Sequence, residues 1–165
     1  MLYNFKTDLE AAKAAEVLVG EVLSSMTNEY TFEDVSDIRE YYYKGDIKAT
    51  SLSTGEEFFI EVKNDSRIAD THNVLCEHEV YIKETGRYEK GNMFCDYNIY
   101  CVVSEKEHKI YVIDFKTLKE KYKRGEFIQI DHLDQQTLGY LVHIGIIKRW
   151  GALLAEIDYS SIGQL

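Results

Sequence analysis

Three residues in the first half of the chain combine side-chain types and a spacing that suit metal-assisted hydrolysis. Asp46 stands just before one expected strand, and Glu61 and Lys63 stand near the end of the next. Two carboxylates can hold a hard, oxygen-seeking cation such as Mg²⁺ or Mn²⁺, which keeps several waters and makes one of them nucleophilic at neutral pH. A lysine beside the cation can orient the attacking water and offset phosphate charge. The group is therefore suited to cleaving a phosphodiester bond.

A β-hairpin would bring these three residues onto one surface. The chain from 47 to 63 alternates apolar and polar residues in two runs, as paired strands do. A loop centred on Thr54-Gly55 pairs Asp46 with Lys63, and the alternation of side chains puts Glu61 on the same face. The same register pairs Lys48 with Glu61. The opposite face is apolar and consists of Ile47, Ala49, Phe58, Ile60 and Val62.

A helix expected over Asp8–Met26 would supply a further acid. Its apolar residues share one broad face: Ala11, Ala12, Ala15, Val19, Val22, Leu23 and Met26. Three charged residues project elsewhere, toward solvent: Glu10, Lys13 and Glu21. Glu16 lies at the edge of the apolar face. If the helix covers the hairpin, Glu16 is the acid that can approach Asp46 and Glu61, although a carboxylate at this edge can also extend outward into solvent.

The rest of the chain predicts a mixed sheet with helices packed against it, in one domain over residues 1–165. No proline, repeat or flexible linker interrupts the sequence. The expected elements are strands at 47–52, 58–63, 98–104 and 109–113, a helix at 114–123, a strand near 139–144 and a closing helix near 146–156.

Composition is that of a globular protein without a targeting segment. Apolar residues make up 45% of the 165 residues and aromatic residues 13%, which favours a packed, sheet-containing fold. No apolar run approaches the roughly 20 residues that span a bilayer. The N-terminus lacks the apolar core and cleavage site of a signal peptide. We therefore expect a cytoplasmic protein that does not insert into a membrane.

The net charge of −10 argues against indiscriminate nucleic-acid binding, but the basic residues are unevenly distributed. The segment from Lys116 to Arg124 holds five basic residues and one acid. A solvated helix face is one interpretation of this run. The other is a surface that contacts DNA phosphates through Lys119, Lys121, Lys123 and Arg124.

At these positions the chain resembles the PD-(D/E)XK nuclease superfamily. The first motif reads Gly45-Asp46, with glycine in place of the customary proline, and the second reads Ile60-Glu61-Val62-Lys63. A longer agreement resembles a branch of small phage or mobile-element nucleases. It comprises Lys63-Asn64-Asp65, then Thr71-His72-Asn73 followed by Glu77, and Asp96-Tyr97, with His72 at a position where that branch has glycine.

The resemblance implies an α/β, restriction-endonuclease-like fold, with a mixed central β-sheet flanked by helices. It also implies a metal-dependent nuclease acting on DNA, in which Asp46, Glu61 and the Val62 carbonyl hold Mg²⁺ or Mn²⁺ and Lys63 positions the attacking water. An acid from a preceding helix usually joins the site in this superfamily, and Glu16 has the direction that fits.

Other interpretations stay open from the sequence alone. Asp, Glu and Lys on a surface hairpin often form cross-strand ion pairs without a catalytic role. An acidic phage-type protein that mimics DNA or binds a host enzyme would suit the net charge, and an inactive nuclease fold that binds DNA would suit the motifs. The sequence also leaves open a homodimer, and whether cleavage is endonucleolytic, exonucleolytic or directed at junctions.

Overall fold

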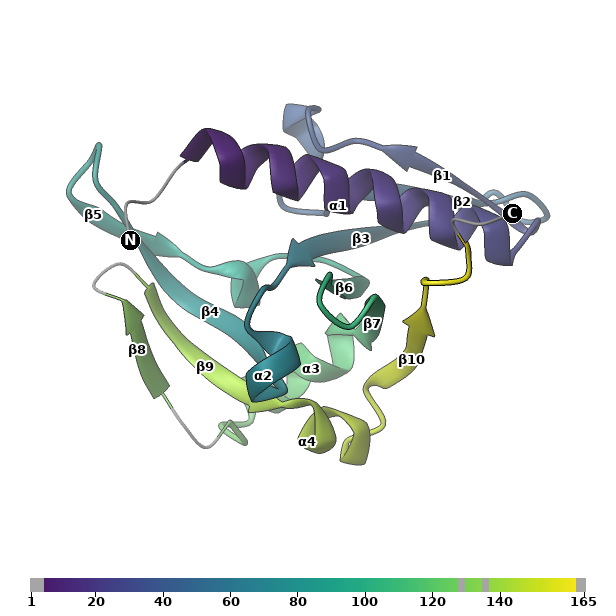
Figure 1. Ribbon diagram of the computed structural model, residues 1–165. Helices are drawn as coiled ribbons and strands as arrows, with labels where there is room; N and C mark the ends of the chain where they lie inside the picture. Colours follow the sequence, from purple (N-terminus) through teal and green to yellow (C-terminus); the bar gives the residue numbers. More distant parts are fainter. Residues whose placement is uncertain (1–4, 128–129, 135–136, 163–165) are drawn as a thin grey trace.

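The protein has a mixed α/β architecture built from two sheets and their covering helices. The computed structural model describes residues 5–127, 130–134 and 137–162 (Figure 1). A six-stranded sheet has the order β1-β2-β3-β6-β7-β10, and a four-stranded sheet has the order β5-β4-β9-β8. The strands are β1 (Tyr30–Asp34), β2 (Ile47–Ser51), β3 (Glu57–Asn64), β4 (Asn73–Ile82), β5 (Arg87–Lys90), β6 (Ile99–Ser104), β7 (Lys109–Asp114), β8 (Ile130–Asp134), β9 (Thr137–His143) and β10 (Leu153–Asp158). The helices are α1 (Phe5–Met26), α2 (Ile68–Thr71), α3 (Phe115–Lys123) and α4 (Ile144–Arg149), with short 3-10 turns η1 (Arg39–Tyr41) and η2 (Asn92–Phe94).

The six-stranded sheet is mixed, as the sequence predicts. Strands β3 and β6 run parallel, whereas the other neighbouring pairs are antiparallel. The chain between β3 and β6 contains α2, β4, β5 and η2. Two strands of the second sheet are therefore inserted in the crossover that joins the parallel pair.

Alternation along the central strands gives the large sheet two apolar faces. One face packs under α1, where Val19 and Val22 meet Ile60 and Val62 of β3. On the other face, Tyr100 and Val102 of β6 join residues of β4, β9, α3 and α4 in a second cluster. Figure 1 shows α1 along one side of the sheet, with β4, β9 and α4 on the opposite side. Because Glu61 and Lys63 alternate with Ile60 and Val62, they belong to the face away from α1.

The β2–β3 hairpin forms, but its predicted register is wrong. Lys48 pairs with Phe59 instead of Glu61, a shift of two residues. Gly55 has a φ of +74° and donates its N–H to the Ser51 carbonyl at 2.9 Å. It is therefore the last residue of the loop and does not lie at the centre of the loop. A shift of two leaves every side chain on its predicted face, where a shift of one would have reversed them all. The ladder ends at the Ile47–Ile60 pair, just after Asp46 in the chain.

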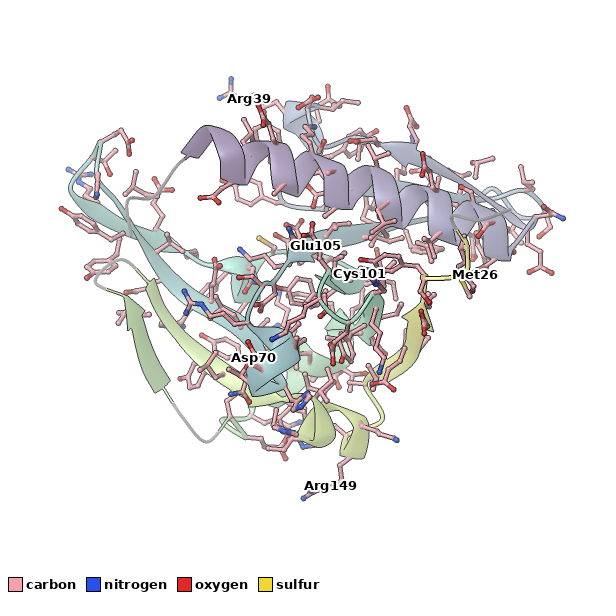
Figure 2. All side chains as sticks on the ribbon, in the orientation of Figure 1. Met26, Arg39, Asp70, Cys101, Glu105 and Arg149 are labelled. Atoms are coloured by element: carbon pink, nitrogen blue, oxygen red, sulfur yellow. The ribbon has the colours of Figure 1, made fainter. Side chains whose placement is uncertain are left out.

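Helix α1 begins at Phe5, three residues before the predicted start. Its apolar face includes Ala15, Val19 and Val22 as predicted, but Met26 is 57% exposed and was wrongly assigned to that face. Figure 2 shows Met26 at the C-terminal end of α1. Lys13, predicted to project toward solvent, is only partly exposed, and its ammonium contacts Ser36, Asp37 and Glu16. Among the described helices, none is long and apolar enough to cross a membrane.

The C-terminal segment corrects the prediction of a closing helix near 146–156. Helix α4 ends at Arg149, and Gly151 follows with a φ of +73°, a left-handed conformation that stops a helix. From Leu153 the side chains alternate between partly buried and exposed, and this segment pairs with β7 as strand β10. The helix assignment failed because apolar content alone does not distinguish the two periods in so short a run.

Gly45 lets the chain approach β3 closely just before Asp46. Its φ is +143°, and a Cβ built there would lie 2.8 Å from the carbonyl oxygen of Ile60. The neighbouring Asp46 N–H donates to that same carbonyl at 2.8 Å. Proline, which fixes φ near −65°, could not take this conformation. The backbone at position 45 therefore requires glycine.

Gly45→Ala should lower the free energy of unfolding by about 2 kcal/mol or more, because the new Cβ meets β3 and a strained φ alone costs about 1–3 kcal/mol. Gly20→Ala is the matched control, since a Cβ at Gly20 in α1 meets nothing within 4 Å. This control should gain about 0.5–1 kcal/mol from helix propensity. Urea unfolding measures both. Equal stability of Gly45→Ala and wild type would contradict the close approach.

Candidate active site

Asp46 and Glu61 meet at the point where β2 begins and β3 continues past it. One carboxylate oxygen of Asp46 accepts the Val62 N–H at 2.9 Å, and the carboxyl groups of Asp46 and Glu61 share a side-chain hydrogen bond. The N–H and C=O of one strand residue point to the same side. The Val62 carbonyl therefore faces the same side of β3 as Asp46, as a backbone metal ligand would have to.

Burial and mutual repulsion make both carboxyl groups reluctant to ionise. Burial is the largest cause and, with the Asp46 charge close by, it raises the pKa of Glu61 to about 9. Burial also raises the pKa of Asp46 to about 6, although the Val62 N–H opposes the shift by favouring the carboxylate. The charge of Glu16 acts in the same raising direction on both groups. Without a cation, the pair is therefore held partly protonated near neutral pH.

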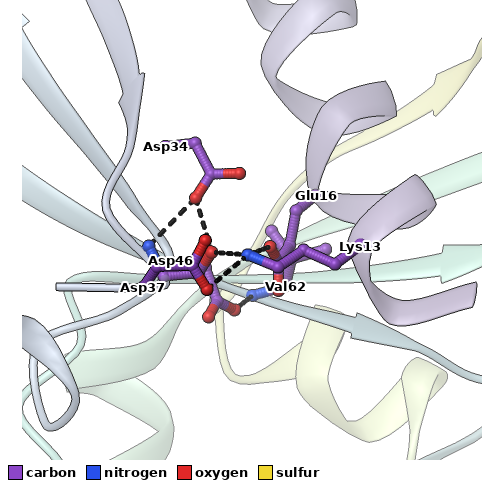
Figure 3. Close-up of polar contacts among 7 residues, drawn as sticks. Lys13, Glu16, Asp34, Asp37, Asp46 and Val62 are labelled. Atoms are coloured by element: carbon purple, nitrogen blue, oxygen red, sulfur yellow. Dashed lines mark hydrogen bonds and ion pairs between the residues drawn. The ribbon is translucent and has the colours of Figure 1, made fainter. Parts of the chain in front are cut away.

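Glu16 extends from α1 beside Lys13, and its place in the site with Asp46 and Glu61 stays a prediction. It is 9% exposed, and its Oε2 atom makes no hydrogen bond. The nearest cation is Lys13, whose Nζ lies 3.4 Å from that oxygen. Figure 3 shows Lys13 and Glu16 extending from the helix toward Asp46 and the loop after β1. The charge of Glu16 acts on Asp46 and Glu61, but the three carboxylates do not form one close metal-holding group among the described residues.

Lys63 lies on the same face of β3 as Glu61, at the mouth of a cavity of about 240 Å³. Its side chain is 45% exposed, and its Nζ lies 3.8 Å from Glu77 of β4. Glu61, Lys63 and Glu77 all line this cavity, with Asn92, Cys95 and Tyr97. An open pocket with acids and a lysine on its wall can admit a phosphate group and water.

Glu77 has a larger part in the site than its sequence pattern indicated. Its N–H donates to the Asn92 side chain at 2.7 Å. A Cβ at Gly91 would lie only 2.3 Å from the Glu77 carbonyl oxygen, so glycine is required there. The only sequence signal for Glu77 was its place after the Thr71-His72-Asn73 segment. His72 has a φ of +56°, the left-handed conformation that glycine adopts most easily, so its replacement of glycine leaves the turn in place.

The donor set of this site fits Mg²⁺ or Mn²⁺. Among the described residues, no three His, Cys, Asp or Glu side chains form a ready-made metal-holding group. Mg²⁺, however, usually binds proteins through one or two carboxylates and keeps several waters. Asp46 and Glu61 provide two hard oxygen ligands, and the raised pKa of each reflects negative charge that a cation would offset. The Oε2 atom of Glu16, which is buried and makes no hydrogen bond, adds further negative charge that a cation would offset.

The basic run on α3 divides into paired and exposed residues. Lys119 donates to the Cys95 carbonyl at 2.7 Å and pairs with Asp96, which places its ammonium at the rim of the cavity. Lys121 pairs with Glu126 at 3.2 Å and lies over the Trp150 ring. Lys123 and Arg124 are exposed. A role of these four residues in DNA binding stays a prediction.

Comparison with protein-family models, curated proteins and solved structures gave no match to this chain. Function is therefore inferred from the residues of the site and their geometry.

Glu61→Gln should change how stability depends on pH in the metal-free protein. The folded-state pKa values of Asp46 and Glu61 lie above their ordinary values near 4, so the folded state binds more protons. Their contribution to stability is complete below about pH 4 and is lost as pH rises to about 9. Glutamine cannot ionise and can still donate to Asp46, so the variant should lose less stability over this range and exceed wild type at the alkaline end.

Urea unfolding in EDTA at a series of pH values measures this difference. Glu21→Gln, an exposed position on the same helix as Glu16, should follow wild type throughout. Parallel curves for Glu61→Gln and wild type would mean that the two carboxyl groups do not share a proton.

Proposed function

We propose that this chain is a metal-dependent nuclease that hydrolyses phosphodiester bonds in DNA, on a restriction-endonuclease-like fold. The observation that carries the proposal is the contact between the half-buried carboxyl groups of Asp46 and Glu61, beside the Val62 backbone and next to an open cavity with Lys63 on its wall. The mixed sheet with its parallel β3–β6 pair and the covering α1 is consistent with that fold.

Each residue has a distinct task in the proposed reaction. Asp46, Glu61 and the Val62 carbonyl hold Mg²⁺ or Mn²⁺, and Glu16 contributes through ordered waters or a second ion. The bound cation supplies a hydroxide-like water and stabilises charge on the phosphate. Burial of the carboxylates strengthens their hold on the cation, because electrostatic attraction is larger where water is excluded.

Lys63 positions the water that attacks the phosphate. Its ammonium lies at the cavity mouth, two residues from Glu61 and on the same face of the strand. Glu77 at 3.8 Å restrains the flexible lysine chain without enclosing it. The ammonium can thus donate to a water or to a phosphate oxygen while keeping its position. Lys119 at the rim offers a second cation for the DNA backbone.

The net charge of −10 favours a rival, a non-catalytic acidic protein that mimics DNA or binds a host enzyme. A third candidate is an inactive nuclease fold that binds DNA. The three differ in what they bind: a nuclease takes a divalent cation at Asp46 and cleaves, an inactive fold binds DNA without cleavage, and a mimic does neither. Incubation with supercoiled, linear and branched DNA, with and without Mn²⁺, separates them and identifies the preferred substrate.

Asp46→Asn should abolish most Mn²⁺ affinity and reduce cleavage on the order of 100-fold or more, because Lewis-acid stabilisation of the transition state amounts to several kcal/mol. The fold should persist, since removing a charge near Glu61 and Glu16 relieves repulsion. Asp70→Asn is the control, an exposed aspartate paired with Lys106 on the surface. Calorimetric Mn²⁺ titration and a plasmid-cleavage assay give the result. Undiminished Mn²⁺ binding in a folded Asp46→Asn variant would refute the site.

Lys123→Gln and Arg124→Gln should each flatten the dependence of log Kd on log salt by about 0.9, the amount expected for one lost phosphate contact. Lys121→Gln should have a smaller effect, because Glu126 already neutralises that ammonium. Fluorescence-anisotropy binding to a labelled duplex in Ca²⁺, measured over a range of salt, tests this. A slope that none of the three changes alters would mean that the run is a solvated helix face.

A further inference from the structure

Lys13 is a cation held inside a group of acids next to the proposed metal site. Its Nζ lies 3.0 Å from Asp37 and 3.4 Å from Glu16, and it donates to the Ser36 hydroxyl. Ser36 in turn donates its N–H and hydroxyl to Asp34. Figure 3 shows this chain of contacts running from α1 to the loop after β1. The ammonium is therefore fixed by partners from two elements.

Glu16 links this group to the metal site. Its carboxylate is nine-tenths buried, and its Oε2 has only the 3.4 Å ion pair with Lys13 and no hydrogen bond. The charges of Glu16 and Asp34 both act on Asp46. Glu16, Asp34 and Ile47 line one part of an open groove of about 460 Å³ between α1 and the first strands. A hydrated ion could enter there.

We propose that the Lys13 ammonium, between Glu16 and Asp37, stands in for a second divalent cation, so that the protein binds one Mg²⁺ or Mn²⁺ and not two. This inference rests on the proposed nuclease site at Asp46 and Glu61. It assigns Lys13 as a positioning residue, which acts through Glu16 and does not touch the substrate.

The physical reason is competition for one negative region. A buried carboxylate needs a counter-charge, and a lysine on the same helix, three residues away, supplies it without an entropic cost of capture from solution. A divalent ion at Glu16 would have to displace or closely approach that ammonium, and the two positive charges repel. The ammonium has no open coordination position and cannot activate water as a metal ion does. Glu16 therefore stays an outer ligand of the single ion.

Lys13→Gln tests the proposal by counting bound ions. Wild-type protein should bind one Mn²⁺ by calorimetry and by electron paramagnetic resonance, and Lys13→Gln should bind two. Lys13→Gln should also melt at a lower temperature than wild type in EDTA and gain more from added Mn²⁺, because its acids have lost their resident counter-ion. Lys13→Arg keeps the charge and should bind one ion.

Two further variants locate the new site. Lys13→Gln combined with Glu16→Gln should return to one ion, because the second site loses its buried carboxylate. Lys106→Gln removes a lysine that is ion-paired to Asp70 elsewhere on the surface, and should leave the count at one.

The outcomes separate the two proposals. Two ions in wild type, or one ion in folded Lys13→Gln, would overturn the role of Lys13 while leaving the site at Asp46 intact, provided that Asp46→Asn still abolishes binding. If Lys13→Gln does not fold, two ions in wild type or in Lys13→Arg overturns the inference, and one ion in both supports it. Absence of any Mn²⁺ binding in wild type would overturn both proposals.

Discussion

The contact between the half-buried carboxyl groups of Asp46 and Glu61 is the constraint around which the other features of the site are arranged. Two like charges in a region with little water repel, and burial disfavours each of them further. The protein answers in three ways: burial and the neighbouring Asp46 raise the pKa of Glu61 to about 9, the Val62 N–H donates to Asp46, and Lys13 pairs with Glu16 nearby. None of these three interactions would offset the negative charge of the carboxylates as well as a divalent cation. On the proposed function, relief of this repulsion would make metal binding there favourable.

This contact forms where strand β3 extends beyond the end of its neighbour β2. Strand β2 begins at Ile47, whereas β3 continues to Asn64. Beyond the start of β2, the polar groups of β3 on that side meet the Asp46 side chain and not another strand. The close approach at Gly45 brings Asp46 to this position, and the one at Gly91 does the same for Glu77 on the second sheet. Gly45 and Gly91 thus allow the close backbone approaches on the two sides of the site.

Charge in this protein is organised locally. The chain carries a net charge of −10, and several of its lysines near the site are committed to acids of the same chain: Lys13 to Asp37, Lys63 to Glu77 and Lys119 to Asp96. Most of these pairs are solvent-exposed on at least one side, so each contributes little to stability. Their importance is that they hold the lysine side chains in fixed positions. A phosphate arriving at the cavity would find lysines already oriented and able to exchange one acidic partner for another.

The sequence by itself determined which residue types the candidate site contains and much of the local structure. The apolar alternation around Glu61 and Lys63 and the helical phase of Glu16 are properties of short segments, and side-chain direction follows from the period of a strand or helix. These predicted the first helix, the hairpin, the strands β6 and β7 and helix α3 with small errors at their ends. Only the tertiary structure decided the register of the hairpin, the strand β10, the second sheet, and the roles of Lys13, Asp34 and Glu77. These features depend on contacts between residues far apart in the chain, such as Lys13 with Asp37 or Lys63 with Glu77. Such a contact produces no repeating pattern of apolar and polar residues in either segment, so the sequence does not reveal it.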